Sequence, residues 1–308
     1  MPEHDQLSED LVAAATALFG SHSGRRALHA KGIWCAGTFT GTEEGRALCR
    51  AAHLDGGPAP ALIRFSNGSG DPESDDAERQ ARGLAVKLRP ESGDETDMVA
   101  TTNRTFPVRT PEDFLELLRL RAPDPETGEP DMEKLGAFLA AHPEAQPAIA
   151  TTVGVEPPAS FATIPYFSPH AFRYVNESDR GTWIRFRWLP EADEEHIPDD
   201  DARAKGANYL SDDLRARLDD GHVAFDLMLH VRPEGASLTD PTEVWPEEPE
   251  LVHAGRLEIT AAVDDPEGGG HIEVFDPTRV GDGIELSDDP VLHARPRAYS
   301  VSAYRRLG

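Results

Sequence analysis

The sequence is poor in cysteine and in long apolar runs, and each shortage excludes a class of protein. Its 308 residues include 2 cysteines, too few for a disulfide framework or a cage of cysteine ligands around a metal. No apolar run approaches the roughly 20 residues that cross a bilayer as a helix, so the sequence does not predict a membrane protein. Residues 1–9 are acidic, whereas a secretory signal peptide begins basic and continues apolar. We therefore expect a cytoplasmic protein.

Basic charge is also scarce. The chain has 56 acidic and 30 basic residues, for a formal net charge of −26 at pH 7. A chain this acidic repels nucleic acids and anionic membrane surfaces, so we expect neither as a partner. Only Lys31, Lys87, Lys134 and Lys205 are lysines, so 26 of the basic residues are arginines, whose planar fork suits fixed bidentate contacts with carboxylates.

Several common cofactor motifs are missing as well. The glycine-rich segment Ser66–Gly70 follows an apolar run but lacks both the lysine of a phosphate-binding loop and the spacing of a dinucleotide fingerprint, so we interpret it as a turn. No His-Glu-x-x-His motif occurs, and zinc is not expected. Neither Cys35 nor Cys49 lies in a Cys-x-x-Cys-His motif, which excludes covalent haem attachment.

Hydrophobic periodicity favours an antiparallel fold. Alternation with period two predicts strands over Leu28–Phe39, Ala61–Ser66, Leu84–Leu88, Trp183–Trp188, His222–Val231 and Leu257–Ala261. Helical spacing predicts helices from a capping serine at Ser8 to Phe19, from Thr110-Pro111 onward, and over Asp131–Ala141. Strands and helices do not alternate regularly, so we expect the α+β class: an eight-stranded antiparallel β-barrel with helical insertions. No repeat or linker divides the chain, which predicts one domain over residues 1–308.

One histidine is notable for its neighbours. His29 lies within the segment Arg26–Gly32. Taken alone, a histidine in a predicted strand is more often a packed or surface side chain than a catalyst, so this position by itself indicates no function.

Ordered blocks along the chain resemble the haem catalase family. Arg26–Gly32 resembles the distal-histidine signature of that family, and Arg295–Gly308 resembles its proximal haem helix. The blocks between them keep the order of the family: Ile63–Ser66, Arg82–Lys87, Tyr166–Asn176, Asp240–Pro246 and Phe275–Pro277. The resemblance covers the barrel core of a typical catalase, without the N-terminal arm and the C-terminal helical region. The chain therefore resembles the small catalase-related peroxidases.

The resemblance implies haem b as the cofactor. In the proximal helix of the family, a tyrosine seven residues before an arginine supplies the iron ligand, and Tyr299 has that place here. Arg295 lies four residues earlier on the same helical face and implies a cation beside the phenolate, although Pro296 follows it and predicts a distorted helix. Arg26, Arg64 and Arg306 occupy the positions that bind the haem propionates in the family.

On the distal side, the resemblance implies that His29 moves a proton between the two peroxide oxygens and that Ser66 hydrogen-bonds the imidazole. The family also places an asparagine in a Val-Gly-Asn-Asn stretch, which this chain lacks. Counting from Asp97 assigns Thr102 to that position and leaves Asn103 as the alternative. A threonine lacks the NH₂ group of the amide, so we expect peroxidase activity to exceed catalase activity.

The expected enzyme is a haem-dependent peroxidase. It would reduce hydrogen peroxide or organic hydroperoxides with a small organic electron donor, and a homodimer is possible. Two alternatives stay open at this point: a fatty-acid hydroperoxide isomerase similar to allene oxide synthase, and a barrel that binds haem without turnover.

Overall fold

The strands of the computed structural model form a closed barrel. The structure describes residues 2–124, 126–247, 251–267 and 271–307. The strands are β1 (Gly32–Gly41), β2 (Pro58–Asn67), β3 (Arg82–Leu88), β4 (Thr96–Thr101), β5 (Tyr166–Phe167), β6 (Phe172–Val175), β7 (Gly181–Pro190), β8 (Val223–Val231), β9 (Leu251–Val263) and β10 (Ile284–Leu286). All pairings between them are antiparallel.

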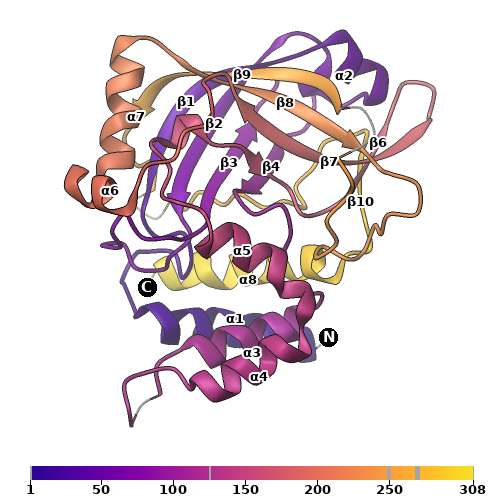
Figure 1. Ribbon diagram of the computed structural model, residues 1–308. Helices are drawn as coiled ribbons and strands as arrows, with labels where there is room; N and C mark the ends of the chain where they lie inside the picture. The colour runs from indigo at the N-terminus through magenta and orange to yellow at the C-terminus, as the bar shows by residue number, and fades with distance from the viewer. Residues whose placement is uncertain (1, 125, 248–250, 268–270, 308) are drawn as a thin grey trace.

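The sheet order is β10-β6-β7-β5-β4-β3-β2-β1-β9-β8, and β7 also pairs with β8. This extra pairing closes eight strands into a ring, while β6 and β10 extend from the edge at β7 (Figure 1). The eight-stranded antiparallel barrel and the mixture of helices and strands predicted from the sequence are both confirmed.

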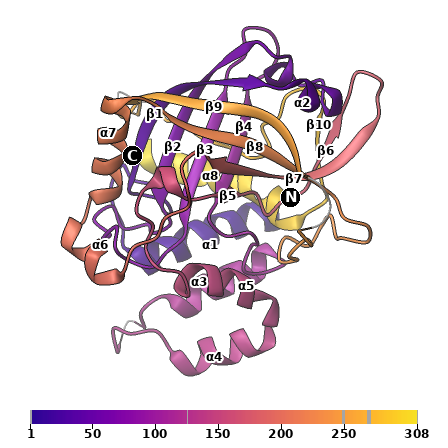
Figure 2. The same ribbon diagram turned by 45° about the horizontal axis from the view of Figure 1, so that its top comes forward.

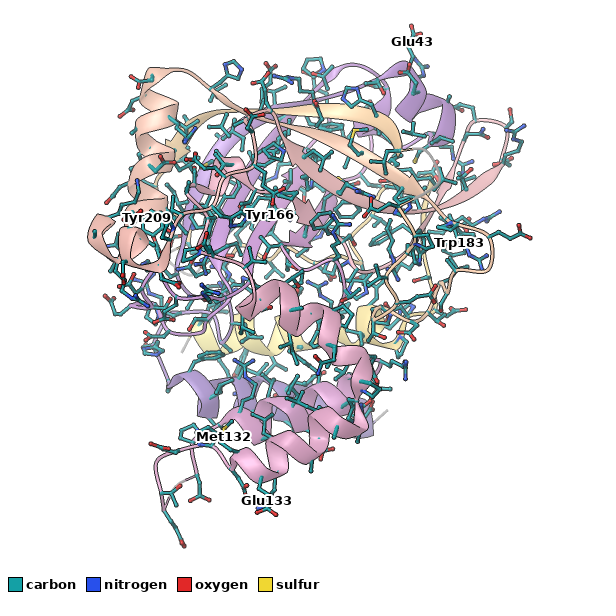
Figure 3. The ribbon with its side chains drawn as sticks, viewed as in Figure 1. Glu43, Met132, Glu133, Tyr166, Trp183 and Tyr209 are labelled. Atoms are coloured by element: carbon teal, nitrogen blue, oxygen red, sulfur yellow. The ribbon has the colours of Figure 1, made fainter. Side chains whose placement is uncertain are left out.

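The barrel interior is a packed core. Along β8, Val223, Phe225, Leu227 and Leu229 are buried, as the period of two requires. The ring of Phe65 from β2 lies 5.5 Å from that of Phe161 and 5.9 Å from those of Tyr166 and Phe225, measured between centroids. Figure 3 shows Tyr166 among the strands at the centre of the barrel. Because large side chains fill the interior, we look for a ligand site on the outside of the barrel wall.

The α-helices lie around the barrel, and several of them gather on one side of it (Figure 1). They are α1 (Pro2–Phe19), α2 (Glu43–Leu48), α3 (Pro111–Arg121), α4 (Met132–Ala141), α5 (Gln146–Val153), α6 (Asp199–Lys205), α7 (Tyr209–Asp220) and α8 (Pro290–Leu307). In Figure 1, α8 runs between the barrel and α1, and Figure 2 shows α3 and α4 beyond α1. Within the described ranges, none of the helices combines the length and the apolar character that a membrane span requires.

Two predicted helix starts are confirmed and one is wrong. The hydroxyl of Thr110 accepts a hydrogen bond from the backbone N–H of Asp113 (3.1 Å) and caps α3, and the carboxylate of Asp131 caps α4 by accepting from Lys134 N (3.0 Å). Ser8, expected to be an N-cap, lies inside α1. The helix extends about two turns further toward the N-terminus because Pro2 suits a first helical turn, where no N–H bond is lost.

The first strand begins further along the chain than predicted. β1 begins at Gly32 rather than Leu28, because the backbone of His29 has φ = +56°, which is incompatible with an extended strand. His29 therefore belongs to the turn that precedes the barrel.

Candidate active site

A histidine, a serine and a glycine form the distal part of the site on the outer face of β2 and β3. His29 Nδ1 lies 3.0 Å from Ser66 Oγ. A Cβ on Gly83 would lie 2.9 Å from His29 Nδ1 and 2.8 Å from Ser66 Oγ, closer than nonbonded atoms approach. Only glycine at this position leaves room for the imidazole and its serine partner. The structure thus brings together the predicted pair and adds Gly83, which the sequence analysis did not single out.

The environment of His29 keeps its imidazole neutral. Burial, together with the nearby charges of Arg64, Arg295 and Arg26, lowers its pKa to about 4, and a hydrogen bond with the backbone of Asn67 acts in the opposite direction. We assign the ring proton to Nδ1, which faces Ser66, so that Nε2 is left as the proton acceptor. The imidazole is therefore a base at neutral pH.

The strand register identifies a third distal position. Ser66 pairs with Gly83, and Gly83 pairs with Thr101 of β4. Residues opposite one another in neighbouring strands project to the same face of a sheet. Thr101 therefore belongs to the face that carries Ser66 and His29.

The two positions proposed from the sequence make other contacts. Thr102 Oγ1 accepts a hydrogen bond from the backbone N–H of Arg82 (3.1 Å), and Thr102 lines a separate surface pocket of about 150 Å³. The Asn103 amide bonds the hydroxyls of Thr151 (3.1 Å) and Thr152 (3.0 Å). The geometry favours Thr101 over Thr102 and Asn103 as the distal partner of His29. A shift of one residue reverses the face of a strand position, and counting from Asp97 did not account for the register.

A chain of side chains forms the proximal part of the site. Arg295 Nε donates to Tyr299 Oη (2.9 Å), and Arg295 Nη2 also contacts that oxygen. Arg295 Nη1 lies 3.0 Å from His170 Nε2, and His170 Nδ1 lies 2.6 Å from Asp289 Oδ2. His170 and Asp289 are almost completely buried. The helix continues through Pro296, and the contact between Arg295 and Tyr299 is made despite that proline.

The sequence analysis assigned no role to two members of this chain. His170 lies in a block that resembles the catalase family, yet only the fold places it beside Arg295. Asp289 also accepts from the backbone N–H groups of Val291 (2.8 Å) and Leu292 (3.3 Å) at the start of α8. No local pattern identifies Asp289, because it lies 119 residues from His170 along the chain.

The three predicted propionate-binding arginines cluster beside the distal histidine. Arg26 and Arg64 lie over the ring of Trp34, with centroid distances of 5.3 and 5.5 Å. Burial and mutual repulsion lower the pKa of Arg26 and that of Arg64. Arg306 and Arg26 both bind the carboxylate of Glu267, a residue with no predicted role. Among the described residues, none places a carboxylate in ion-pair contact with Arg64.

Comparisons with known proteins identify the family of the chain. The catalase family model matches residues 21–308. The chain belongs to the catalase family. It is 42% identical over 303 residues to a catalase-related peroxidase of Mycolicibacterium paratuberculosis, covering 97% of this chain and 95% of the relative. It is 32% identical to a catalase-related peroxidase of Synechococcus elongatus, covering 97% and 88%.

A solved fungal catalase has the same fold as this catalase-family chain. The TM-score is 0.81 at 24% sequence identity, and the match covers 94% of this chain and 60% of the fungal one. The likeness of structure at this low identity concerns the fold alone.

The residues of this catalase-family chain fit a haem. On α8, the phenolic oxygen of Tyr299 contacts two nitrogen atoms of Arg295. In the turn before β1, the imidazole of His29 is neutral, and the charge of Arg295 is one of the causes that lower its pKa. The Nε atoms of Arg64 and Arg306 are buried without a hydrogen-bond partner, which suits a ligand that brings carboxylates. The described residues contain no group of three or more His, Cys, Asp or Glu side chains that could hold a metal ion by themselves.

Proposed function

We propose that this chain binds haem b and reduces hydrogen peroxide or organic hydroperoxides with electrons from a small organic donor, and that its peroxidase activity exceeds its catalase activity. The chain is an oxidoreductase of the catalase family that acts on peroxide. The observation that carries the finer proposal is the neutral His29, held by Ser66, near the Arg295–Tyr299 pair of α8.

A tyrosine and a set of arginines would hold the cofactor. Tyr299 would ligate the iron through its phenolic oxygen, with Arg295 stabilising the anion. The Nε of Arg64 is buried without a hydrogen-bond partner and would donate to a propionate, and Arg26 and Arg306 lie beside it. Bound haem would supply the redox centre that accepts and passes on the electrons needed to cleave the O–O bond.

The protein itself would move the proton. Nε2 of His29 would take a proton from one peroxide oxygen and return it to the other, so that water can leave. Ser66 would keep the imidazole ring in one plane and one tautomer. Gly83 would leave room for His29 and Ser66 to contact each other, because it has no side chain. A base with a pKa of about 4 stays unprotonated through the neutral range, so this step does not wait for a deprotonation.

The preference for peroxidase activity follows from the third distal position. We assign this position to Thr101, whose hydroxyl is shared with the backbone of Asn103: the N–H of Asn103 lies 3.2 Å from it and the carbonyl 3.3 Å. A hydroxyl engaged in a local turn is a weaker anchor for a second peroxide than an amide NH₂. Oxidation of an organic donor is then favoured over disproportionation.

An absorption spectrum of the purified protein, followed by a donor assay, tests the proposal. We expect a Soret band and oxidation of an aromatic donor by peroxide; absence of the Soret band would remove the haem hypothesis. A fatty-acid hydroperoxide given without a donor should not yield an epoxide, which separates the peroxidase from the isomerase. The relatives named as peroxidases favour an enzyme over a non-catalytic barrel. The cytoplasmic location, the single domain and the homodimer stay predictions.

A further inference from the structure

Two of the three clustered arginines bind a carboxylate of this chain. Glu267 accepts from Arg26 Nη2 through Oε1 (2.7 Å) and from Arg26 Nη1 through Oε2 (3.1 Å). Arg306 Nη1 donates to the same two oxygens at 2.6 and 2.8 Å. The side chains of Glu267 and Arg306 are 10% and 4% exposed, so these charges interact with little screening by water.

These contacts occupy both Nη atoms of Arg26. Its Nη1 and Nη2 both point to Glu267, and Nη2 also donates to the carbonyl of Glu273 (3.0 Å). A second carboxylate therefore cannot take the fork of Arg26 unless Glu267 leaves it. Arg64 differs, because its Nη2 donates to the carbonyl of Ala30 (3.1 Å) and its Nε has no partner.

The backbone keeps Glu267 in place. The N–H of Glu273 donates to Glu267 Oε1 (3.0 Å), so this carboxylate accepts from two guanidinium groups and one amide. Such charge-assisted hydrogen bonds are about twice as strong as neutral ones. An incoming carboxylate has to replace all of them.

We propose that Glu267 competes with a haem propionate for Arg26 and Arg306, and so sets how firmly this protein retains its cofactor. One propionate binds Arg64 without competition, and the other exchanges with Glu267. The inference rests on the haem site of the proposed function and adds a residue that determines cofactor retention.

The test is the rate at which the purified holoenzyme loses haem to an excess of apomyoglobin, followed by the change in Soret absorbance. Glu267→Gln keeps the size of the side chain and removes its charge. We expect haem loss about tenfold slower, since the charged competitor is gone. The matched control is Glu285→Gln, which removes the carboxylate from an exposed pair with Arg173 and should leave the rate unchanged.

A second variant makes the test independent of a general change in stability. Arg26→Gln should accelerate haem loss in both backgrounds, but about tenfold more in the Glu267→Gln background, where no charged side chain competes with the propionate for that arginine. Equal acceleration in the two backgrounds would contradict the competition. Should Glu267→Gln fail to fold, the shorter Glu267→Asp, which reaches the arginines less well, takes its place with the same expected direction.

The outcomes separate this inference from the proposed function. Unchanged or faster haem loss in Glu267→Gln would overturn the inference, since Glu267 would then be a bystander or would position the arginines for haem. A wild-type protein that binds no haem would overturn the proposed function as well, and would be recognised before any variant is compared.

Discussion

The distal and proximal halves of the site are built in different ways. On the barrel, His29 and Ser66 are positioned mainly by the backbone: a turn with φ = +56° at His29, the register of β2 against β3, and the missing side chain at Gly83. On α8, Tyr299 is positioned by a chain of side chains that runs through Arg295 to the buried pair of His170 and Asp289.

The two halves should therefore respond differently to mutation. The distal half should be intolerant of added volume, because a side chain at Gly83 would collide with His29 and Ser66. A site fixed by an ion-pair chain depends on each partner, because removing one leaves a buried polar group without its hydrogen bond. The following variants test the contrast.

Tyr299→Phe should have the largest effect. It removes the phenolic oxygen to which Arg295 donates and preserves the shape of the ring, so we expect haem to bind weakly or with a changed spectrum. The measurement is the Soret and charge-transfer absorption of the purified variant. Tyr304→Phe, at an exposed position of the same helix, is the control and should match the wild type. Wild-type bands in Tyr299→Phe would show that the ligand is another residue.

His29→Ala should affect rate rather than binding. Haem content should stay near normal while peroxide reduction slows by about two to four orders of magnitude, the usual share of general acid–base catalysis. Rapid mixing with peroxide gives the rate. If the kinetics stay unchanged, His29 has no part in the proton transfer.

The pH dependence of the wild-type rate tests the protonation state of His29. Because the pKa of His29 lies at about 4, below the ordinary value of 6.5, the base is lost only on acidification below about pH 4. We expect the rate of peroxide reduction to be flat through pH 6.5 and to fall near pH 4. A midpoint near 6.5, measured by pH jump, would contradict the proposed environment of the imidazole.

Gly83→Ala tests the backbone half directly. The added methyl group would lie within 3.0 Å of both His29 and Ser66, so one of them must move. We expect a loss of about tenfold in the rate and about 1 to 3 kcal/mol in the free energy of unfolding, the usual cost of overpacking. The control is Gly136→Ala in α4, where nothing lies within 4 Å of the new Cβ. Full activity in Gly83→Ala would mean that the distal pair is not tightly packed.

Much of this organisation could be predicted from the sequence, and two of the residues that were missed share a cause. Alternation of apolar residues predicted the strands of the barrel, and a family resemblance led to His29, Ser66 and the clustered arginines. Asp289 and Glu267 were missed because their partners are far away in sequence: Glu267 lies 241 residues from Arg26. Such contacts exist only after the barrel closes and α8 docks on it, and no local pattern encodes them.

The smallest expected effect concerns Thr101 and Thr102, which the sequence count and the strand register assign differently. Thr101→Asn should add an NH₂ donor on the His29 face and raise oxygen evolution from peroxide relative to oxidation of an aromatic donor. One added hydrogen bond is worth about 0.5 to 1.5 kcal/mol, which is at most about tenfold in rate. Thr102→Asn should change this ratio little, because that side chain contacts the backbone of Arg82. If Thr102→Asn raises the ratio and Thr101→Asn does not, the count from Asp97 is right, and the chain must twist after β4 so that Thr102 projects toward His29.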